Sequence, residues 1–232
     1  MIVILTGAGI SQESGISTFR DADGLWKNER IEDVGTPGGF ARNPEKVLDF
    51  YNNLRRELLY SEIAPNPAHF ALAKLEKESS EPVLVITQNI DNLHERAGTK
   101  NLLHMHGELC KARCNACNNV TQWEKDMSQS DVCMKCGASG RLRPHIVWFE
   151  EMPLYMDEIW RSLSNCRLFV SIGTSGHVYP AANFVRTARQ SGANTLELNL
   201  ERSLGADYFH DGRYGKAGSV VPLWVDEILA KA

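Results

Sequence analysis

The sequence predicts an α/β fold, in which a doubly wound, mostly parallel sheet carries a smaller lobe built from two inserts. Short apolar runs, typical of buried strands, alternate with helix-like stretches, and this alternation predicts parallel strands joined by helices. Two segments, 26–75 and 110–140, break the alternation. With 232 residues and 43% hydrophobic composition, the chain can form one main domain and a small second lobe.

The expected strands are the apolar runs Ile2–Leu5, Val83–Ile86, Ile146–Phe149, Leu168–Ile172 and Thr195–Leu198. The expected helices lie between or after them, at Ala68–Lys77, Asn92–Arg96, Ala181–Gln190 and Trp224–Lys231. A further helix should begin at Asn43-Pro44-Glu45 and run through Leu59, because this tripeptide supplies an N-cap, a proline at the first helical position and an early acid.

We therefore divide the chain into a large domain and two modules of a small lobe. The large domain comprises 1–25, 76–109 and 141–232. Residues 26–75, in which no convincing strand is found, form a helical module. Residues 110–140 form the second module, which is polar and cysteine-rich and has too little apolar content to hold a core unaided.

The composition excludes several classes of function. A net charge of −4 gives no general attraction to nucleic acid or anionic membrane. No apolar run reaches the roughly 18 residues of a transmembrane helix, and strand-like sequence from Ile2 argues against a signal peptide. Four of the six cysteines lie in CxxC pairs, which fits a reducing, cytoplasmic compartment better than a disulfide framework. We expect a monomer with no nucleic-acid or membrane partner.

Two CxxC pairs predict a zinc site. Cys114 and Cys117 are separated by fifteen residues from Cys133 and Cys136, a spacing typical of zinc ribbons. Four thiolates complete a tetrahedral shell and leave no open position, so the metal would be structural. A redox-active CxxC is the alternative, and two pairs at this spacing argue against it.

A glycine-rich turn follows the first expected strand. Gly7 and Gly9 lie where backbone N–H groups can approach a pyrophosphate at a strand-to-helix turn, so the large domain is predicted to be Rossmann-like. The spacing is not GxGxxG, because the third glycine arrives late, at Gly15. A tight turn without a ligand remains the alternative.

Polar residues also follow three other expected strands. TQNID (87–91), GTS (173–175) and NLE (199–201) each begin where a strand ends, and open α/β sheets bind ligands beyond the carboxyl ends of their strands. The segment TQNID is equally compatible with a loop that caps the following helix. Taken together, the four turns predict a nucleotide site.

The segment HMHG (104–107) contains two candidate bases. In an extended segment His104 and His106 share one face, and a histidine can act as a base near neutral pH. Each of them, taken singly, is also compatible with a structural histidine.

These motifs occur together in a known order. GAGISQESGISTFR (7–20), TQNID, HMHG, the CxxC pairs, RPHIVWF (143–149), GTS and NLE resemble the motifs of the sirtuins, the NAD-dependent protein-lysine deacylases. The resemblance covers about residues 2–225. DGLW (23–26) through Phe50-Tyr51, together with HMHGEL, looks most like the bacterial, class III branch.

The resemblance implies roles for the matching residues. His106 would be the general base and Asn89 a second catalytic residue. The cofactor-binding residues would be Gly7, Ala8, Gly9, Ser11, Ile16, Phe19, Arg20, Gln88, Asn89, Ile90, Asp91, Gly173, Thr174, Ser175, Asn199, Leu200, Glu201 and Ala217. The substrate-binding residues would be Tyr51, Val147, Phe149 and Val178.

It also implies NAD as co-substrate, one structural zinc ion and the acyl-lysine side chains of proteins as substrate. The acyl group would pass to ADP-ribose as nicotinamide is released. The substrate backbone would add a strand between Ile146–Glu150 and Gly173–Tyr179.

Two positions depart from the sirtuin pattern. Glu150 stands where the motif WFGE has glycine, beside the peptide cleft. Class III members also carry Tyr-x-x-Arg to bind an acidic acyl group, and here Tyr51 is followed by Leu54 at the arginine position. Arg55, one residue further, is a candidate partner for an acyl carboxylate. A core stripe that includes Tyr51 and Leu54 is the alternative, so we expect deacetylation and leave desuccinylation or demalonylation open.

Two other functions remain as alternatives. A mono-ADP-ribosyltransferase would use the same NAD site. A zinc-ribbon module that binds nucleic acid is disfavoured by the net charge and by the lack of interleaved basic and aromatic residues in 110–140.

Overall fold

The computed structural model describes residues 1–16 and 25–231. Within these residues the largest sheet has six parallel strands in the order β11-β10-β9-β1-β4-β5. The strands are β1 (Ile2–Thr6), β4 (Val83–Thr87), β5 (Leu102–His104), β9 (Leu168–Ile172), β10 (Asn194–Asn199) and β11 (Asp211–Tyr214). The chain moves outward from β1 in one direction and later returns to its other side, so β1 and β9 meet at the point where the strand order reverses.

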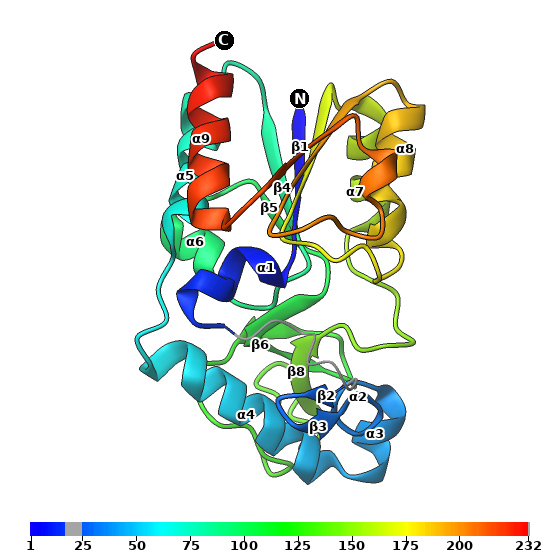
Figure 1. The fold of residues 1–232 in the computed structure, drawn as a ribbon. Helices are drawn as coiled ribbons and strands as arrows, with labels where there is room; N and C mark the ends of the chain where they lie inside the picture. The colour runs from blue at the N-terminus through cyan, green and yellow to red at the C-terminus, as the bar shows by residue number, and fades with distance from the viewer. Residues whose placement is uncertain (17–24, 232) are drawn as a thin grey trace.

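Helices cover both faces of this sheet (Figure 1). On one face lie α5 (Pro67–Glu78), α9 (Ala217–Leu229) and the short α6 (Leu93–Ala97), and on the other lie α7 (Met156–Asn165) and α8 (Phe184–Gln190). Because successive side chains of a strand point to opposite faces, Ile2 and Ile4 pack with α5 and α9, and Val3 and Leu5 pack with α7 and α8. The doubly wound, Rossmann-like sheet predicted from the sequence is confirmed.

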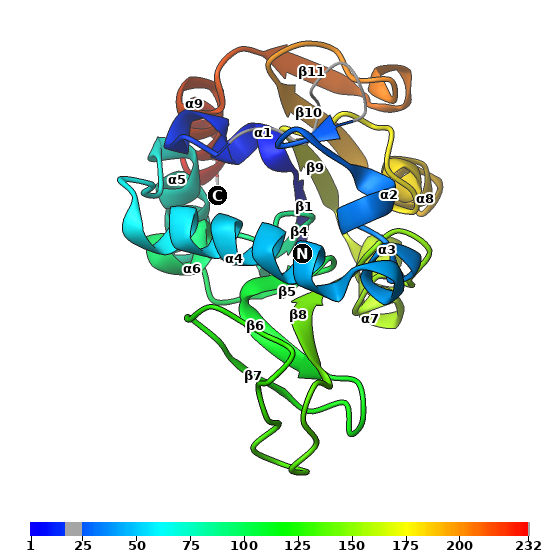
Figure 2. The same ribbon diagram turned by 90° about the horizontal axis from the view of Figure 1, so that it is seen from below.

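The smaller lobe lies beyond the carboxyl ends of the sheet strands (Figure 1). Its helical part contains β2 (Leu25–Trp26), β3 (Glu29–Arg30), α2 (Ile31–Val34), α3 (Pro37–Arg42) and α4 (Pro44–Tyr60). Its second part is an antiparallel sheet of β6 (Gly107–Cys114), β7 (Val120–Gln122) and β8 (Leu142–Ile146), which projects away from the helices (Figure 2). Short helical turns complete the chain: α1 (Ala8–Ser11), η1 (Gln12–Ser14), η2 (Ala181–Asn183) and η3 (Ala206–Tyr208).

Helix α4 begins where its sequence signals predict. The Asn43 side chain accepts a hydrogen bond from the backbone N–H of Lys46 at 3.0 Å, and Pro44 occupies the first helical position. Val47, Tyr51 and Leu58 are buried along one face of the helix, which therefore forms a wall of the small-lobe core.

The structure corrects three expectations. The strand expected at Ile146–Phe149 ends at Ile146, and as β8 it pairs antiparallel with β6 instead of joining the parallel sheet. Its Leu142 and Ile146 are buried in the small lobe. Helix α9 begins at Ala217, seven residues before the expected start, because the Glu13 carboxylate accepts from the Gly218 N–H at 2.7 Å and caps it from another part of the chain.

The third correction concerns 26–75, where no strand is expected. Strands β2 and β3, of two residues each, pair antiparallel at the start of this segment. The same segment, predicted as a small-lobe module, includes most of α5, whose Leu72 and Leu75 pack against the large sheet. The exact domain boundaries stay a prediction.

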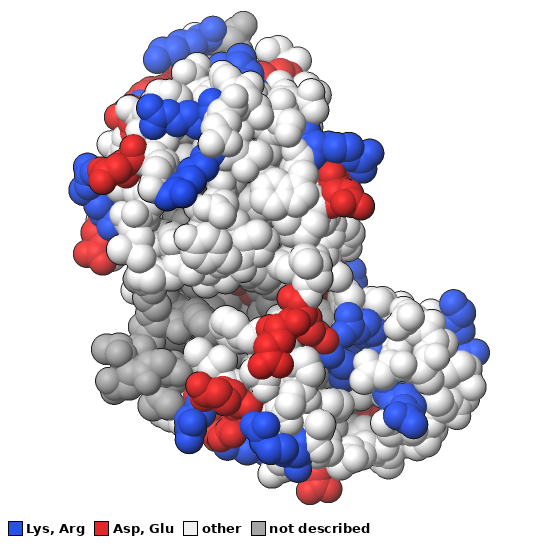
Figure 3. Space-filling view, turned by 90° about the vertical axis from the view of Figure 1, so that its right-hand side faces the viewer, with Lys and Arg blue, Asp and Glu red and all other residues white. Residues whose placement is uncertain are grey.

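Two further observations concern the shape of the molecule and the length of its helices. A hollow separates the large domain from the small lobe on the face shown in Figure 3, and acidic side chains lie at its lower edge. Across the described residues, no helix is both long enough and apolar enough to span a bilayer.

Candidate functional site

Two glycine turns meet where the strand order reverses. The Gly9 N–H donates to the Gly173 carbonyl at 2.9 Å, and the Gly7 N–H donates to the Ile172 carbonyl at 3.0 Å. A Cβ atom on Gly9 would lie 2.7 Å from the Gly173 Cα, and one on Gly173 would lie 2.5 Å from the Ile10 nitrogen. Because both contacts are with backbone, only glycine allows the turns after β1 and β9 to approach this closely.

A third turn, 87–90 after β4, is held by the segment 104–109 through four consecutive carbonyl groups. The Thr87 and Ile90 carbonyls accept from backbone N–H groups of that segment, Met105 and Leu109, at 3.0 and 2.8 Å. The two carbonyls between them lie opposite histidine rings. Gln88 O is 3.0 Å from His106 Nδ1, and Asn89 O is 3.1 Å from His104 Nδ1. The turn therefore has a fixed backbone on which its side chains are presented.

The side chains of this turn form a buried polar cluster with the first glycine turn. The Asn89 amide donates to the Gly7 carbonyl and to Ser11 Oγ, both at 3.1 Å. Ser11 Oγ in turn donates to the Asp91 carboxylate at 3.0 Å, and burial raises the pKa of that carboxyl. The structure thus brings together the glycine-rich turn and the segment TQNID, which the sequence predicted to lie in one site.

His106 has the geometry of a neutral base. Its Nδ1–H donates to the Gln88 carbonyl, which assigns the unprotonated position to Nε2. Burial lowers the pKa of His106, because desolvation outweighs the opposing effect of that hydrogen bond. The His106 carbonyl accepts from the Val147 N–H at 2.9 Å, which places segment 146–150, where the substrate backbone is expected to add, directly beside this histidine.

The other end of the site lies over β9 and β10. The Asn199 amide donates to the Thr174 carbonyl at 2.7 Å, and the Leu200 N–H donates to Asn199 Oδ1 at 3.0 Å. Gln88, Thr174 and Val178 line a small hollow between the turns after β4 and β9. The turns after β1, β4, β9 and β10 thus bring polar groups together at the carboxyl ends of the strands, where α/β sheets bind nucleotides.

The other predicted cofactor residues are placed as follows. Leu200 and Glu201 are exposed at the end of β10, and Ala8, Ile90, Ser175 and Ala217 are half-buried. Ile16 packs at the edge of the small-lobe core. Phe19 and Arg20 lie outside the described residues.

The structure gives Tyr51 and Arg55 environments of their own. Tyr51 is fully buried, its hydroxyl accepts from Trp148 Nε1 at 2.9 Å, and burial raises the pKa of its phenol. Arg55 is 1% exposed and donates to the Leu109 and Lys125 carbonyls at 3.0 and 3.2 Å. These contacts and a hydrogen bond from Nη1 to Asn52 Oδ1 direct the guanidinium into the small lobe, while its Nη2 has no partner among the described residues, so a role of Arg55 toward an acyl carboxylate stays a prediction.

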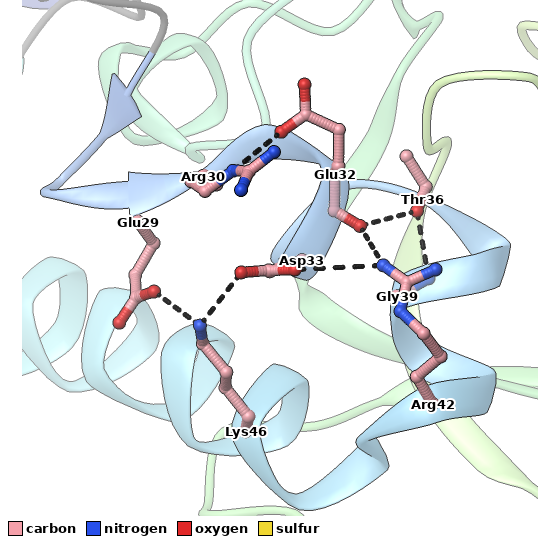
Figure 4. A network of polar contacts seen from close by, with 8 residues as sticks. All are labelled: Glu29, Arg30, Glu32, Asp33, Thr36, Gly39, Arg42 and Lys46. Atoms are coloured by element: carbon pink, nitrogen blue, oxygen red, sulfur yellow. Dashed lines mark hydrogen bonds and ion pairs between the residues drawn. The ribbon is translucent and has the colours of Figure 1, made fainter.

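Segment 146–150, which forms the protein side of the expected substrate site, is anchored to the helical part of the small lobe. The Phe149 N–H donates to the carbonyl of Gly35, the residue that ends α2, at 2.9 Å. Helix α2 is tied to α4 and β3 by Lys46, whose Nζ lies 2.8 Å from Glu29 and 3.2 Å from Asp33 (Figure 4). One wall of the cleft thus depends on this network.

A second network, which the sequence did not reveal, fixes the turn after Val147. The Glu151 carboxylate accepts from Arg143 at 2.7 and 3.0 Å and from the Trp148 N–H at 2.9 Å, and Arg143 stacks on the Trp148 ring. Glu150, the residue in place of the family's glycine, has a φ of +74°. The turn therefore keeps a backbone conformation that favours glycine even though a side chain is present.

Several buried residues behind the site also escaped sequence reasoning. The Asn66 amide donates to the Ile10 carbonyl at 2.7 Å and to Ser14 Oγ at 2.9 Å, which holds the first glycine turn from below. His69 and His94 pack against each other and lie next to Ser11 and Thr6. The Asn66-Pro67 pair predicts a helix start, but no local signal predicts contacts made across more than fifty residues.

The four CxxC cysteines come together in a geometry that fits zinc. The Sγ atoms of Cys114 and Cys136 are 3.8 Å apart, as are those of Cys117 and Cys133. All four ligand atoms lie within 4.8 Å of one another. A tetrahedron with metal–sulfur bonds of about 2.3 Å has edges of about 3.8 Å, so the cluster has the size of a zinc site.

Local backbone structure supports this assignment. Each knuckle is closed by a left-handed residue, Asn118 with φ +57° and Gly137 with φ +72°, and each of these donates its N–H to the first cysteine carbonyl at 2.8 Å. Backbone N–H groups of Cys136 and Lys135 lower the pKa of the Cys133 thiol, whereas burial and hydrogen bonds with the other three cysteines raise that of Cys117.

Comparison with known proteins gives a consistent result. The model of the Sir2 family matches residues 7–180. The chain is 60% identical to "NAD-dependent protein deacylase SIR2rp3" of Leishmania major, over 100% of this chain and 96% of that protein. It is also 60% identical to "NAD-dependent protein deacylase" of Vibrio cholerae serotype O1, over 99% and 93% of the two chains.

Solved structures of similar fold include complexes. A Sir2 homolog–NAD complex is 38% identical, with a TM-score of 0.88 over 99% of this chain and 89% of that chain. The structure described as Sir2 bound to acetylated peptide is 29% identical, with a TM-score of 0.82 over 98% and 92% of the two chains.

The cysteine cluster generates a prediction about metal content. We expect Cys117→Ser to reduce bound zinc from about one ion per chain to almost none and to lower the thermal stability, because three thiolates no longer complete the shell. Cys166→Ser is the matched control, since Cys166 is buried in the large domain and belongs to a different core. Metal analysis of the purified proteins measures the ratio. Full zinc occupancy in Cys117→Ser would contradict the assignment.

Proposed function

The chain belongs to the Sir2 family, the sirtuins, and we propose that it is an NAD-dependent protein-lysine deacylase that transfers the acyl group of a modified lysine to ADP-ribose as nicotinamide is released. The observation that carries the proposal is the position of His106. This neutral base contacts the Gln88 carbonyl through its ring and Val147 of segment 146–150 through its own carbonyl. NAD, when bound, supplies the ribose that receives the acyl group and the nicotinamide that leaves.

The protein's own residues divide into groups by the part of the site they form. We propose that Gly7, Ala8, Gly9 and Ser11 bind the pyrophosphate and its ribose, and that Gln88, Asn89, Ile90 and Asp91 line the nicotinamide pocket. Ile16 would also line the nicotinamide pocket. Phe19 and Arg20 are assigned to the cofactor site from their sequence match alone. The adenosine half would lie against Gly173, Thr174, Ser175, Asn199, Leu200, Glu201 and Ala217.

Asn89 and His106 would be the catalytic residues. The Asn89 amide is fixed by two acceptors, the Gly7 carbonyl and Ser11 Oγ, at the proposed nicotinamide pocket. His106 would take a proton from a ribose hydroxyl at Nε2, while its Nδ1–H stays on the Gln88 carbonyl. The zinc site would act through the fold, because four thiolates complete its shell.

Acyl-lysine peptides are the proposed substrate class. Val147 and Phe149 have their backbone N–H groups bound on one side, to His106 and Gly35, so the strand is fixed before a peptide adds to it. Val178 would form the opposite wall. The net charge of −4 supports a function without nucleic acid or anionic membrane, and we propose a cytoplasmic monomer.

The first prediction concerns His106. We expect His106→Ala to lower the deacylation rate on an acetyl-lysine peptide by about 10²–10⁴-fold, with bound zinc and NAD binding retained. Because burial lowers its pKa, His106 is neutral at pH 7, and on the acid side kcat/KM should fall as the pH drops through that lowered pKa.

Mass spectrometry of the products provides the measurement, and it separates free lysine peptide and O-acyl-ADP-ribose from a peptide or protein that carries ADP-ribose. His210→Ala is the control, since His210 pairs with Thr195 away from the site. Full activity in His106→Ala would overturn the role of His106, and labelling of the target by ADP-ribose would favour the transferase alternative.

The second prediction concerns acyl preference. Leu54 is half-buried, packs against the small-lobe core and lines a hollow on α4 together with Phe50 and Lys46. We expect the protein to favour acetyl- over succinyl-lysine peptide, because no guanidinium is placed at this position to pair with an acyl carboxylate. Leu54→Arg should raise the relative rate on the succinyl peptide, and Leu54→Met should leave it unchanged. A strong succinyl preference in the natural protein would contradict this assignment.

A further inference from the structure

Both ring nitrogens of His104 face oxygen atoms that only accept hydrogen bonds. Nδ1 lies 3.1 Å from the Asn89 backbone carbonyl, and Nε2 lies 2.8 Å from a carboxylate oxygen of Glu95. A neutral imidazole carries one N–H and can satisfy only one of them, whereas an imidazolium donates to both. The His104 side chain is only 6% exposed, so solvent cannot compensate a lost hydrogen bond easily.

We propose that His104 is a positioning residue, held as an imidazolium by Glu95, that fixes the Asn89 carbonyl and thereby the Asn89 amide in the proposed nicotinamide pocket. The proposal rests on the proposed function for its catalytic consequence, and on geometry alone for the charge. His104 and His106 thus have different tasks: the first stays charged to hold the turn, and the second stays neutral to accept a proton.

The surroundings of His104 are consistent with a positive charge. Glu95 from α6 and Glu108 from β6 both lie close to it, and Lys111 neutralises Glu108 at 2.7 Å. Burial opposes protonation, but the hydrogen bond and charge of Glu95 outweigh it, so the pKa of His104 is raised. Asp91 is buried and adds a nearby acid, whose pKa is raised by its own burial.

The other charged or titratable groups on α6 are Arg96, which donates to the Ile63 carbonyl, and His94, whose pKa shifts in the opposite direction to that of His104. His94 is almost wholly buried, and its pKa is lowered well below the usual range, first by burial and then by the charges of His69 and His104. Its Nε2 lies 3.0 Å from the Thr6 hydroxyl. The cluster behind the turn therefore holds one protonated histidine among neutral ones.

The link from His104 to the site runs through one residue. Asn89 is held at three points: its carbonyl by His104, its N–H by Thr87 Oγ1 at 3.1 Å, and its side-chain amide by the Gly7 carbonyl and Ser11. Loss of the contact with His104 would let the Asn89 peptide group shift, and the side-chain amide would shift with it. Small misplacements of catalytic groups lower reaction rates strongly.

Nitrogen NMR of the histidine rings in the full-length zinc-loaded protein tests the charge directly. The spectra should show His104 with both nitrogens protonated at pH 7.5 and His106 with Nδ1–H alone. Glu95→Gln should lower the proton affinity of His104 by about tenfold or more, because an opposite charge is lost. Glu108→Gln, the matched control, removes a carboxylate that makes no hydrogen bond to His104 and should have a smaller effect.

Kinetics test the positioning role. His104→Phe should lower kcat on an acetyl-lysine peptide by about 10- to 100-fold with zinc still bound. In the natural protein kcat/KM should fall as the pH rises through the raised pKa of His104, and Glu95→Gln should abolish that fall, because its amide can donate to a neutral ring.

The outcomes are distinguishable. A neutral His104 at pH 7.5, or a proton affinity equal in Glu95→Gln and Glu108→Gln, would overturn the charge assignment whatever the enzyme's activity. If His104 is protonated but kcat/KM falls at high pH in the same way in Glu95→Gln and in the natural protein, the positioning role is overturned. Lack of any deacylation in the natural protein, with the expected NMR result, would refute the proposed function instead.

Discussion

The segment 104–109 holds four consecutive carbonyl groups of the turn 87–90, and the rest of the site is arranged around this contact. Two of the donors are backbone N–H groups and two are histidine rings, so both side chains and main chain set the turn. A hydrogen bond contributes about 0.5–1.5 kcal/mol net, and a buried carbonyl left without a partner costs more than that. Displacement of the turn would break several such bonds together.

This contact also explains how the two lobes share one site. Strand β5 of the large sheet leads directly through His106 into β6 of the small lobe, and β6 pairs with β8. The proposed base therefore lies at the point where the chain passes from one lobe to the other. From there β8 leads to Val147, whose N–H is bound by the His106 carbonyl. The cysteine cluster lies at the far end of β6, which fits a metal that holds the module and takes no part in the chemistry.

Sequence patterns predicted the parts of the site that depend on local structure. Apolar runs identified β1, β4, β9 and β10, because a parallel sheet buried on both faces requires them. The CxxC spacing predicted the four cysteines that the structure brings together, since each pair is held by a turn of a few residues. The glycine turn was recognisable for the same reason, although the contact between Gly9 and Gly173 that requires it was not.

Features that depend on distant contacts could not be predicted in this way. Arg55 lies at helical spacing from Tyr51, but its orientation is set by the carbonyls of Leu109 in β6 and Lys125 in the cysteine-rich module. Strand β8 resembles a sheet strand in sequence, and only its pairing with β6 shows its place. The pairing of His104 in β5 with Glu95 in α6 is likewise a contact between separate elements, so the sequence indicated His104 as a candidate base and did not predict its contact with Glu95.

The central claim is that the turn 87–90 is fixed before NAD binds. Hydrogen exchange of the Met105 and Leu109 amides, which donate to the Thr87 and Ile90 carbonyls, measures this directly. The account predicts slow exchange in the NAD-free protein, comparable to the core amides of β1, with little further protection when NAD is added. Fast exchange of both amides without NAD, slowed only by the cofactor, would contradict it.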